Sequence, residues 1–255
     1  MLEKARLLAC DAVVLDLEDA VAPEAKDAAR AMVCAALGGF GGREVMVRIN
    51  PPASEWGADD LKAVAKAAPA AVVIPKVSSP ADLAGLRLRM PVWAMIETPM
   101  AVLNLPAIAA SGVGGLILGA NDLLAGMRAR ALPDRRNLWA AMSGLVTAAR
   151  AHGLAAIDGT HNDIHDQAGF AEACAQGRAF GFDGKSLIHP GQIEACNRAF
   201  APSPGEIAWA RRVVAAFAEN PGKGALALDG RMIERLHAEE AERLLALAGM
   251  PAGQA

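Results

Sequence analysis

Short apolar runs recur along the chain, and alanine-rich stretches with apolar residues at every third or fourth position separate them. Continuous Val/Ile/Leu runs are typical of strands buried on both faces, and the intervening spacing is typical of amphipathic helices. The alternation therefore predicts parallel strands joined by helical crossovers. The predicted strands are residues 11–17, 44–50, 70–77, 91–97, 114–120, 153–158 and 177–184.

This alternation, in a chain of 255 residues, favours an α/β fold of the TIM type, a (β/α)8 barrel. A doubly wound open sheet is the second choice, and it is weakened because no G-x-G-x-x-G follows the first strand. Seven strands can be counted, whereas a barrel needs eight. We therefore assign residues 1–200 to a barrel in which one strand is missing or misread.

The pattern changes after a proline-rich break at residues 201–206. A helix is predicted around 205–219, a glycine-rich loop at 220–230 and an amphipathic helix around 238–248. Residues 201–255 are therefore expected to form a C-terminal helical extension.

Composition narrows the classes of function. A hydrophobic content of 53% and a net charge of −3 fit one large globular domain, and 4% aromatic residues without tyrosine argue against a nucleic-acid partner. No apolar window reaches the roughly 18 residues of a membrane span, and the N-terminus lacks signal-peptide features, so we expect a cytoplasmic protein with no membrane partner. The four isolated cysteines indicate neither a zinc site nor a disulfide framework.

Polar residues close most of the predicted strands. In parallel barrels the functional side chains project from the carboxyl ends of the strands. We therefore expect the site to be built from this set: Asp16, Glu18, Asp19, Arg48, Asn50, Lys76, Glu97, Asn121, Asp122 and Asp158.

Glu97 and Asp122 follow consecutive strands. Neighbouring strands are about 4.8 Å apart, so the two carboxylates can converge on one cation, and oxygen ligands of this kind suit Mg²⁺. In the alternative interpretation, Glu97 is an ordinary acid before Pro99 and Asp122 caps the next helix. The spacing alone leaves both interpretations open.

Arg48 lies among apolar residues on a predicted strand, where a buried charge needs an anionic partner. It can clamp a substrate carboxylate with two hydrogen bonds, or it can form a structural ion pair with an acid at the end of the first strand. Lys76 could act as a Schiff-base amine, but pairing with the same acids is the favoured interpretation.

Two loop segments suggest chemistry that we do not favour. His161, Asp163, His165 and Asp166 lie in the segment 159–166, where turn and cap formation explains such residues better than metal binding. The segment 184–192 lacks the spacing of a phosphate-binding loop. His189 within it is interpreted as a packing or hydrogen-bonding residue more readily than as a catalytic base.

Seven motifs, taken in order, resemble the citrate lyase β-subunit family, which includes malyl-CoA and citramalyl-CoA lyases and belongs to the HpcH/HpaI aldolase superfamily. The resemblance extends from about residue 4 to about residue 248. The motifs are DAVVLDLEDAV, VRIN, VVIPKV, MIETP, LGANDL, AARAHGLAAID and GFDGKSLIHPGQ.

This resemblance implies a Mg²⁺-dependent carbon–carbon lyase. Its substrate would be a citryl-, malyl- or citramalyl-like 3-hydroxyacyl-CoA thioester, cleaved by a retro-Claisen route to an acyl-CoA and a 2-oxo acid. By resemblance, Glu97 and Asp122 hold the Mg²⁺, and Arg48 binds the carboxylate or oxyanion of the 2-oxo acid. Such a cation lowers the pKa of the hydroxyl group and orients the substrate.

Further residues are assigned by the same resemblance. Substrate-binding positions are Lys4, near the CoA moiety, together with Ile188 and His189. The supporting residues around the metal, its waters and the basic side chains are Asp16, Glu18, Asp19 and Lys76.

The chain departs from the family pattern at two places. Relatives begin with a strand resembling LFVPG, whereas this chain starts in the helix that follows, so we expect either an upstream start or an open barrel with reduced CoA affinity. Relatives also carry an aspartate in a C-terminal MID motif, which reaches the site of a neighbouring subunit. Here the residue is Glu234, which we expect to be a catalytic acid/base group within a homotrimer or a multiple of it. The alternative is a surface acid beside Arg231 and Arg235.

Two other functions stay open. A class II aldolase acting on a free 2-keto-3-deoxy acid would keep the fold and the metal, but the Glu234 loop argues against it. A catalytically weak CoA-ester binding protein is favoured by the missing strand and by Glu234. The presence of Arg48, Glu97 and Asp122 together argues against it.

Overall fold

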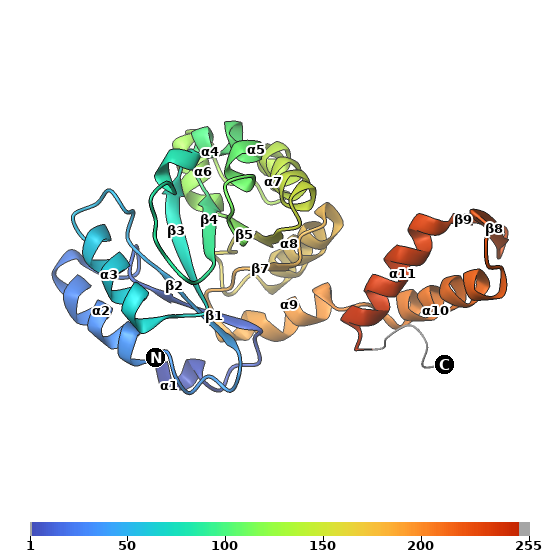
Figure 1. Ribbon diagram of the computed structural model, residues 1–255, viewed down its shortest axis with the longest axis horizontal. Coiled ribbons are helices and arrows are strands. Elements are labelled where there is room, and N and C mark those ends of the chain that lie inside the picture. The colour runs from blue at the N-terminus through green and yellow to red at the C-terminus, as the bar shows by residue number, and fades with distance from the viewer. Residues whose placement is uncertain (1, 250–255) are drawn as a thin grey trace. The chain divides into compact units, whose positions relative to one another are not determined.

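The structure is a computed structural model that describes residues 2–249. The chain divides into two compact units, one ending at Ala199 and one beginning at Phe200 (Figure 1). Within the described part of the chain, no helix has both the length and the apolar character needed to cross a membrane.

The first unit is built on one parallel sheet of seven strands that lie in sequence order, with helices connecting them (Figure 1). The sheet curls into part of a barrel, which confirms the predicted TIM-type α/β fold with one strand lacking. The strands are β1 (Ala12–Asp16), β2 (Glu44–Arg48), β3 (Ala71–Val77), β4 (Val92–Ile96), β5 (Gly115–Leu118), β6 (Ala155–Asp158) and β7 (Gly184–Lys185).

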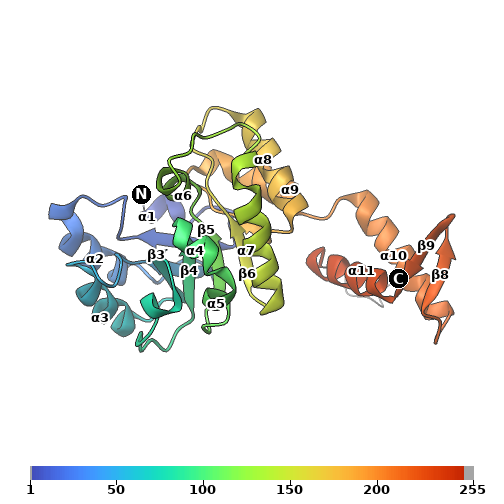
Figure 2. The same cartoon turned by 90° about the horizontal axis from the view of Figure 1, so that it is seen from above.

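Helices cover the outer face of this sheet. For example, α7 packs against β5 and β6, and α2 packs against α3 (Figures 1 and 2). The helices of the unit are α1 (Leu2–Ala5), α2 (Lys26–Ala35), α3 (Gly57–Ala67), α4 (Pro99–Leu103), α5 (Leu105–Ala109), α6 (Ala120–Gly126), α7 (Trp139–Ala151), α8 (Gln167–Phe180) and α9 (Ile193–Phe200).

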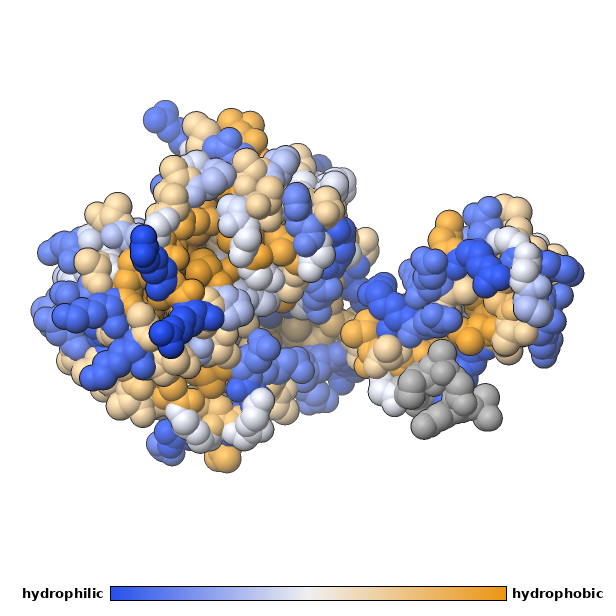
Figure 3. Space-filling view, viewed as in Figure 1, coloured by the Kyte–Doolittle hydropathy of each residue, from blue (hydrophilic) through white to orange (hydrophobic). Residues whose placement is uncertain are grey.

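The inner face of the sheet has its own apolar cluster. Met46, Val73 and Ile117 are buried there, from three different strands, and Trp93 and Met95 of β4 pack against them. The period-two alternation of strand side chains explains why these residues share one face. Figure 3 shows that the first unit contains a hollow with hydrophobic surface.

The sheet does not close within residues 2–249, because β1 and β7 each pair with a strand on one side only. Val14, in register with Met46 and so on the same inner face, is 47% exposed. The open edge explains this exposure, since a valine inside a complete barrel is normally buried.

The last predicted strand, residues 177–184, is wrong. Helix α8 continues to Phe180, and β7 begins only at Gly184. The buried residues Phe170, Cys174 and Gly177 follow the spacing of a helix, and Gly181 ends it with φ 93°, the left-handed conformation that glycine adopts without strain. The other six predicted strands are confirmed, each shorter by a few residues or fewer.

The second unit consists of two helices and a hairpin: α10 (Pro204–Glu219), β8 (Ala225–Leu228), β9 (Arg231–Glu234) and α11 (Arg235–Leu247). Ser203 caps α10, and Glu206 completes a reciprocal capping box with it. The unit has its own core, in which Val213 and Phe217 of α10 meet Ile233 of the hairpin and Leu245 of α11.

The hairpin corrects the predicted loop at 220–230. Asp229 and Gly230 connect two antiparallel strands, with φ 50° and 74°. An Asp-Gly pair between alternating apolar positions is a strong hairpin signal. The sequence "LALDGRMIE" contains this signal, but the several glycines of residues 220–230 favoured a loop over a hairpin.

Candidate active site

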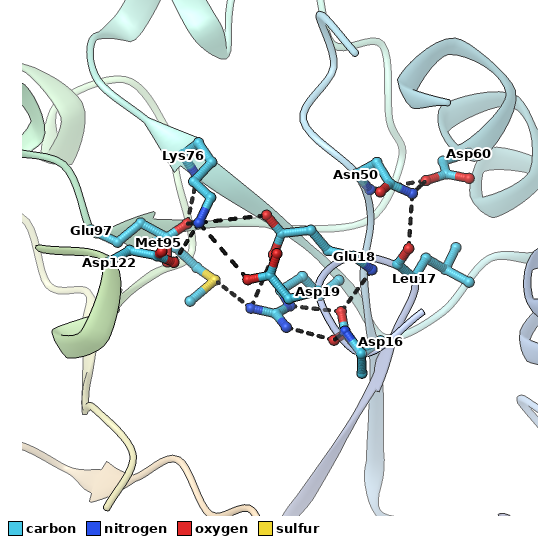
Figure 4. Close-up of polar contacts among 12 residues, drawn as sticks. Asp16, Leu17, Glu18, Asp19, Asn50, Asp60, Lys76, Met95, Glu97 and Asp122 are labelled. Carbon is cyan, nitrogen blue, oxygen red and sulfur yellow. Dashed lines mark hydrogen bonds and ion pairs between the residues drawn. The ribbon is translucent and has the colours of Figure 1, made fainter. Parts of the chain in front are cut away.

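Arg48 and Asp16 lie side by side where β2 and β1 end, as register partners. Arg48 Nε donates to Asp16 Oδ1 at 2.7 Å and Nη2 donates to Oδ2 at 2.5 Å, which is a bidentate pair (Figure 4). Arg48 Nη1 lies 3.1 Å from Glu18 Oε2. Arg48 therefore forms the expected ion pair with acids at the end of the first strand, and its role toward a substrate carboxylate stays a prediction.

Asp16 and Glu18 have opposite pKa shifts. Burial alone would raise the pKa of Asp16, but the hydrogen bonds and charge of Arg48, with the amides of Glu18 and Ala20, lower it below its usual value. For Glu18, burial prevails over the attraction of Arg48 and raises the pKa to about 7. The two neighbouring carboxyl groups therefore differ, because Arg48 favours the charged form of Asp16 whereas burial favours the protonated form of Glu18.

Glu97, directly after β4, is 1% exposed. Its Oε1 accepts a hydrogen bond of 2.6 Å from the amide of Lys76, while Oε2 is buried with no hydrogen-bond partner in the described residues. Burial raises the pKa of Glu97 more than the nearby Lys76 lowers it. A Cβ atom at Gly119 would lie 2.3 Å from Oε2, so glycine at this position gives the carboxylate its space.

Lys76 lies at an irregularity of β3. The register against β4 shifts between Ile74 and Val77, and Lys76 has φ 55°, an uncommon conformation for a residue with a side chain. The preceding Pro75 has no amide hydrogen to give to the sheet. The irregularity turns the amide of Lys76 toward Glu97.

The side chain of Lys76 is the centre of the acidic cluster (Figure 4). Its Nζ donates to Asp122 Oδ2 and lies 3.8 Å from Glu18 Oε1 and 3.9 Å from carboxylate oxygens of both Asp19 and Glu97. Burial works to lower the pKa of Lys76, but the hydrogen bond to Asp122 and the surrounding acids raise it above its usual value. The amine is therefore a charged partner, which confirms the favoured pairing interpretation.

Asp122 belongs to the first turn of α6, but it does not cap the helix. The N-cap position is Gly119, and no side chain caps there. The carboxylate of Asp122 points instead to Lys76. Similarly, the N-cap of α4 is Thr98, so Glu97 does not cap that helix. The capping interpretation of Asp122 is therefore wrong.

A buried network behind the cluster was missed by the sequence analysis. Lys26 Nζ donates to the carbonyls of Leu17 and Glu18 and to Asn50 Oδ1, at 2.7 to 2.8 Å. Asn50 in turn donates to Asp60 Oδ2 at 2.7 Å. Lys26 and Asp60 fix the backbone that carries Glu18. The sequence does contain a sign of this network: Lys26 in α2 and Asp60 in α3 are charged residues on the apolar faces of amphipathic helices.

The donor set fits Mg²⁺. The described residues contain no group of three His, Cys, Asp or Glu side chains arranged for a metal. Mg²⁺ needs no such group, because it keeps several waters and is commonly held by one or two carboxylates and by substrate oxygens. Within the described residues, Glu97 Oε2 is buried with no hydrogen-bond partner, and Asp122 binds the Lys76 ammonium group, which also lies 3.9 Å from Glu97 Oε1. These two residues are the ones that could hold the ion.

Asp158, at the end of β6, does not join the cluster. It is fully buried and binds Arg135 Nη1 with both oxygens at 2.9 Å and Lys185 Nζ at 2.8 Å. Asn121 likewise pairs with Asn162, at 2.8 Å. These two strand-end residues have structural partners.

The structure does not connect the expected substrate-binding residues to the cluster. Within residues 2–249, no hydrogen bond or ion pair joins the acidic cluster to Lys4, Ile188 or His189. Ile188 is 54% exposed. His189 precedes the short helix Pro190–Gln192, and its Nδ1 accepts a hydrogen bond from the amide of Gly191 at 3.1 Å. This hydrogen bond agrees with the interpretation of His189 as a structural residue.

The segment 159–166 forms turns and caps as interpreted. Asp163 Oδ1 accepts from the amide of His165 at 2.9 Å, and Asp166 caps α8 through the amide of Gly169 at 2.9 Å. His161 lies 3.6 Å from Asp166 and against the ring of Phe170.

Glu234, in the second unit, ends β9 and immediately precedes α11. Its backbone amide donates to His237 Nδ1 at 2.9 Å. Within the described residues it forms no ion pair with Arg231 or Arg235, whose guanidinium groups lie over aromatic rings instead. The catalytic role of Glu234 and the alternative of a surface acid beside these arginines both stay predictions.

The fold and the cluster define an α/β-barrel enzyme with acids and basic side chains gathered at the ends of neighbouring strands. A profile of the family described as HpcH/HpaI aldolase/citrate lyase matches residues 1–190, and the chain belongs to that family. It is a lyase by this membership.

Individual relatives support the family assignment. The chain is 46% identical to a (3S)-malyl-CoA thioesterase of Cereibacter sphaeroides (strain KD131), over 97% of this chain and 90% of the relative. It is 34% identical to the citrate lyase subunit beta of Escherichia coli (strain K12), over 92% and 84%. Among solved structures, protein CitE from Mycobacterium tuberculosis in complex with magnesium, acetoacetate and coenzyme A matches with a TM-score of 0.82 and 35% identity, over 94% of this chain and 91% of that chain.

Proposed function

We propose that the protein is a Mg²⁺-dependent carbon–carbon lyase that cleaves a malyl-like 3-hydroxyacyl-CoA thioester to an acyl-CoA and a 2-oxo acid. The observation that carries this proposal is that, among the described residues, Glu97 Oε2 is buried without a hydrogen-bond partner, while Glu97 Oε1 lies 3.9 Å from the same Lys76 ammonium group that binds Asp122. The CitE structure with magnesium, acetoacetate and coenzyme A supports the chemical class of the ligands.

The chemistry assigns a task to each residue of the cluster. Bound at Glu97 and Asp122, Mg²⁺ would lower the pKa of the substrate hydroxyl and stabilise negative charge on oxygen. Arg48, whose orientation is fixed by its two hydrogen bonds to Asp16, would bind the carboxylate of the oxo-acid part. Glu18, whose pKa is about 7, can accept the hydroxyl proton.

Bond breaking then needs a proton at a second place. As the carbon–carbon bond breaks, the hydroxyl-bearing carbon becomes the carbonyl of the oxo acid, and the electron pair passes to the thioester as an enolate. The enolate carbon must receive a proton. We assign this step to Glu234 of a neighbouring copy in a homotrimer, because a carboxylic acid at the start of α11 can donate a proton.

The direct test is an acyl-CoA panel with Mg²⁺ and with EDTA, analysed by mass spectrometry. Malyl-, citramalyl-, methylmalyl- and citryl-CoA should be compared, and acetyl-CoA or propionyl-CoA release identifies cleavage. Release from at least one ester with Mg²⁺, and none with EDTA, is expected. Binding of the esters without any product would support the binding-protein alternative. If the esters are not cleaved but a free 2-keto-3-deoxy acid assayed in parallel is, the aldolase alternative is supported.

A second candidate is thioester hydrolysis. The observation that favours it is the 46% identity to malyl-CoA thioesterases over 97% of this chain. The products separate the two reactions, because cleavage of malyl-CoA gives glyoxylate and acetyl-CoA, whereas hydrolysis gives malate and a free thiol. Parallel assays for glyoxylate and for thiol therefore decide between them.

Complementation between inactive variants tests the shared site. Glu234→Ala and Arg48→Ala protomers should each be inactive alone. Mixed assemblies should regain part of the activity, because some sites then combine an intact Arg48 with an intact Glu234 from the neighbour. If mixing restores nothing beyond either variant, Glu234 does not act across an interface.

A further inference from the structure

Lys76 has a position that neither metal binding nor ion pairing alone explains. Its ammonium group is bonded to Asp122 and lies 3.9 Å from Glu97, the two residues that fit Mg²⁺. A cation bound by both carboxylates would meet this positive charge within a few ångströms, where like charges repel strongly. The ammonium and a divalent cation therefore compete for the same oxygen of Asp122.

The backbone position of Lys76 does not depend on the contacts of its side chain. The strand irregularity, with φ 55°, aims the amide of Lys76 at Glu97 Oε1. This amide keeps Glu97 oriented even after the ammonium leaves. The side chain of Lys76 can therefore move while Glu97, a candidate metal ligand, keeps its orientation.

The cluster also offers the ammonium a second place. Glu18 Oε1 and Asp19 Oδ2 lie 3.8 and 3.9 Å from Nζ, on residues that follow β1. Neither distance is a hydrogen bond, so a small movement of the flexible side chain away from Asp122 would shorten both contacts. The lysine side chain is one-third exposed and has room to move.

We propose that Lys76 is a positioning residue that occupies the cation's place at Asp122 when no divalent cation is bound, and that moves to Glu18 and Asp19 when the cation enters. In this arrangement Lys76 keeps the two metal-binding carboxylates from repelling each other in the empty site. It also weakens cation binding, because its contact with Asp122 must first be broken. This inference rests on the proposed metal site.

The test measures Mg²⁺ binding by isothermal titration calorimetry without any substrate. Lys76→Met removes the charge, retains much of the side-chain length and leaves the backbone amide in place. Its Kd for Mg²⁺ should fall at least about tenfold. Lys76→Arg, which keeps the charge, should stay within about threefold of the unaltered protein, and so should Lys62→Met on the exposed side of α3.

An unchanged or weaker affinity in Lys76→Met would overturn the inference. Lys76→Gln serves as a second neutral variant with the same expectation if Lys76→Met does not fold. Melting temperatures give an independent readout: Mg²⁺ should raise the melting temperature of Lys76→Met more than that of the unaltered protein, because the variant lacks a counter-ion in the empty site. Equal increases would also contradict the inference.

Asp122→Asn separates this inference from the metal site on which it rests. If the unaltered protein binds no Mg²⁺, or if Asp122→Asn binds it equally well, the metal site itself is wrong and the inference falls with it. If Asp122→Asn loses binding while Lys76→Met keeps the original Kd, only the role of Lys76 is wrong.

Discussion

At the scale of single residues, the site depends on a few side chains that are placed against their ordinary preferences. Glu97 is buried with one oxygen that has no hydrogen-bond partner in the described part of the chain, and Lys76 is a non-glycine residue at φ 55°. Such features cost free energy and are maintained when the surrounding structure fixes them. They occur here at the two residues nearest the proposed cation, which is where strain and unsatisfied groups are expected to serve function.

Gly119→Ala should disturb the metal site through Glu97 alone. The new Cβ would lie 2.3 Å from Glu97 Oε2, so the carboxylate must move. Displacement of about 1 Å in a catalytic group can cost about a hundredfold in rate, and we expect a fall of that order in kcat/KM together with weaker Mg²⁺ binding. Gly38→Ala is the control, because a Cβ there meets no atom within 4 Å. Equal behaviour of the two variants would contradict this role for Gly119.

Glu18→Gln should change how stability depends on pH in the presence of EDTA. The folded pKa of Glu18 is about 7, above the ordinary value of 4.5, so its contribution is fully present below pH 4.5 and is lost as pH rises through 7. The loss is at most about 3 kcal/mol. Urea unfolding at pH 5 and pH 8.5 should show that the variant gains stability relative to the unaltered protein at the higher pH. A constant difference between them would contradict the raised pKa.

At the scale of elements, the ends of neighbouring strands determine which residues meet. The expectation that functional side chains lie at the carboxyl ends of parallel strands correctly placed Arg48, Glu97 and Asp122 in one region. It succeeded because the register of a parallel sheet follows from apolar runs that are easy to recognise in the sequence. It also included Asp158, which the structure buries in a separate ion pair with Lys185. A sequence shows which residues lie at strand ends, but it does not show which partner each side chain binds.

Asp158→Asn should therefore destabilise the fold without a direct effect on the cluster. The substitution leaves Arg135 and Lys185 with a buried positive charge and no anion, which costs about 3 to 5 kcal/mol. Chemical denaturation measures this cost. Asp27→Asn breaks an exposed ion pair with Arg30 and should cost less than about 1 kcal/mol. Similar losses in both variants would show that the buried network is less important than its burial suggests.

Gly230→Ala tests the hairpin that carries Glu234. Gly230 has φ 74°, which costs a residue with a Cβ roughly 1 kcal/mol. The second unit should unfold at lower denaturant concentration, and activity should fall if Glu234 takes part in catalysis. Gly205→Ala, in the first turn of α10, is the control because a Cβ there meets open space. An unaffected stability in Gly230→Ala would indicate that the turn differs from the one described.

At the scale of the whole chain, the sequence predicted the class of fold because repeated strand and helix patterns reinforce one another. The errors arose where local signals compete: residues 177–184 read as a strand although Gly181 ends a helix, and the Asp229-Gly230 turn was counted as loop. The irregularity at Lys76 and the buried Lys26 depend on contacts between distant segments. Long-range contacts of this kind leave little trace in local patterns.

Metal-dependent cleavage at Glu97 and Asp122 is best tested by measuring the formation of glyoxylate from malyl-CoA. The unaltered protein, Glu97→Gln and Asp122→Asn should each be assayed with Mg²⁺ and with EDTA. We expect glyoxylate and acetyl-CoA in equal amounts from the unaltered protein with Mg²⁺, none with EDTA, and a loss of at least about a hundredfold in both variants. Cleavage that persists in EDTA or in both variants, or release of malate and free thiol alone, would show that the protein is not a lyase that depends on these two carboxylates and Mg²⁺.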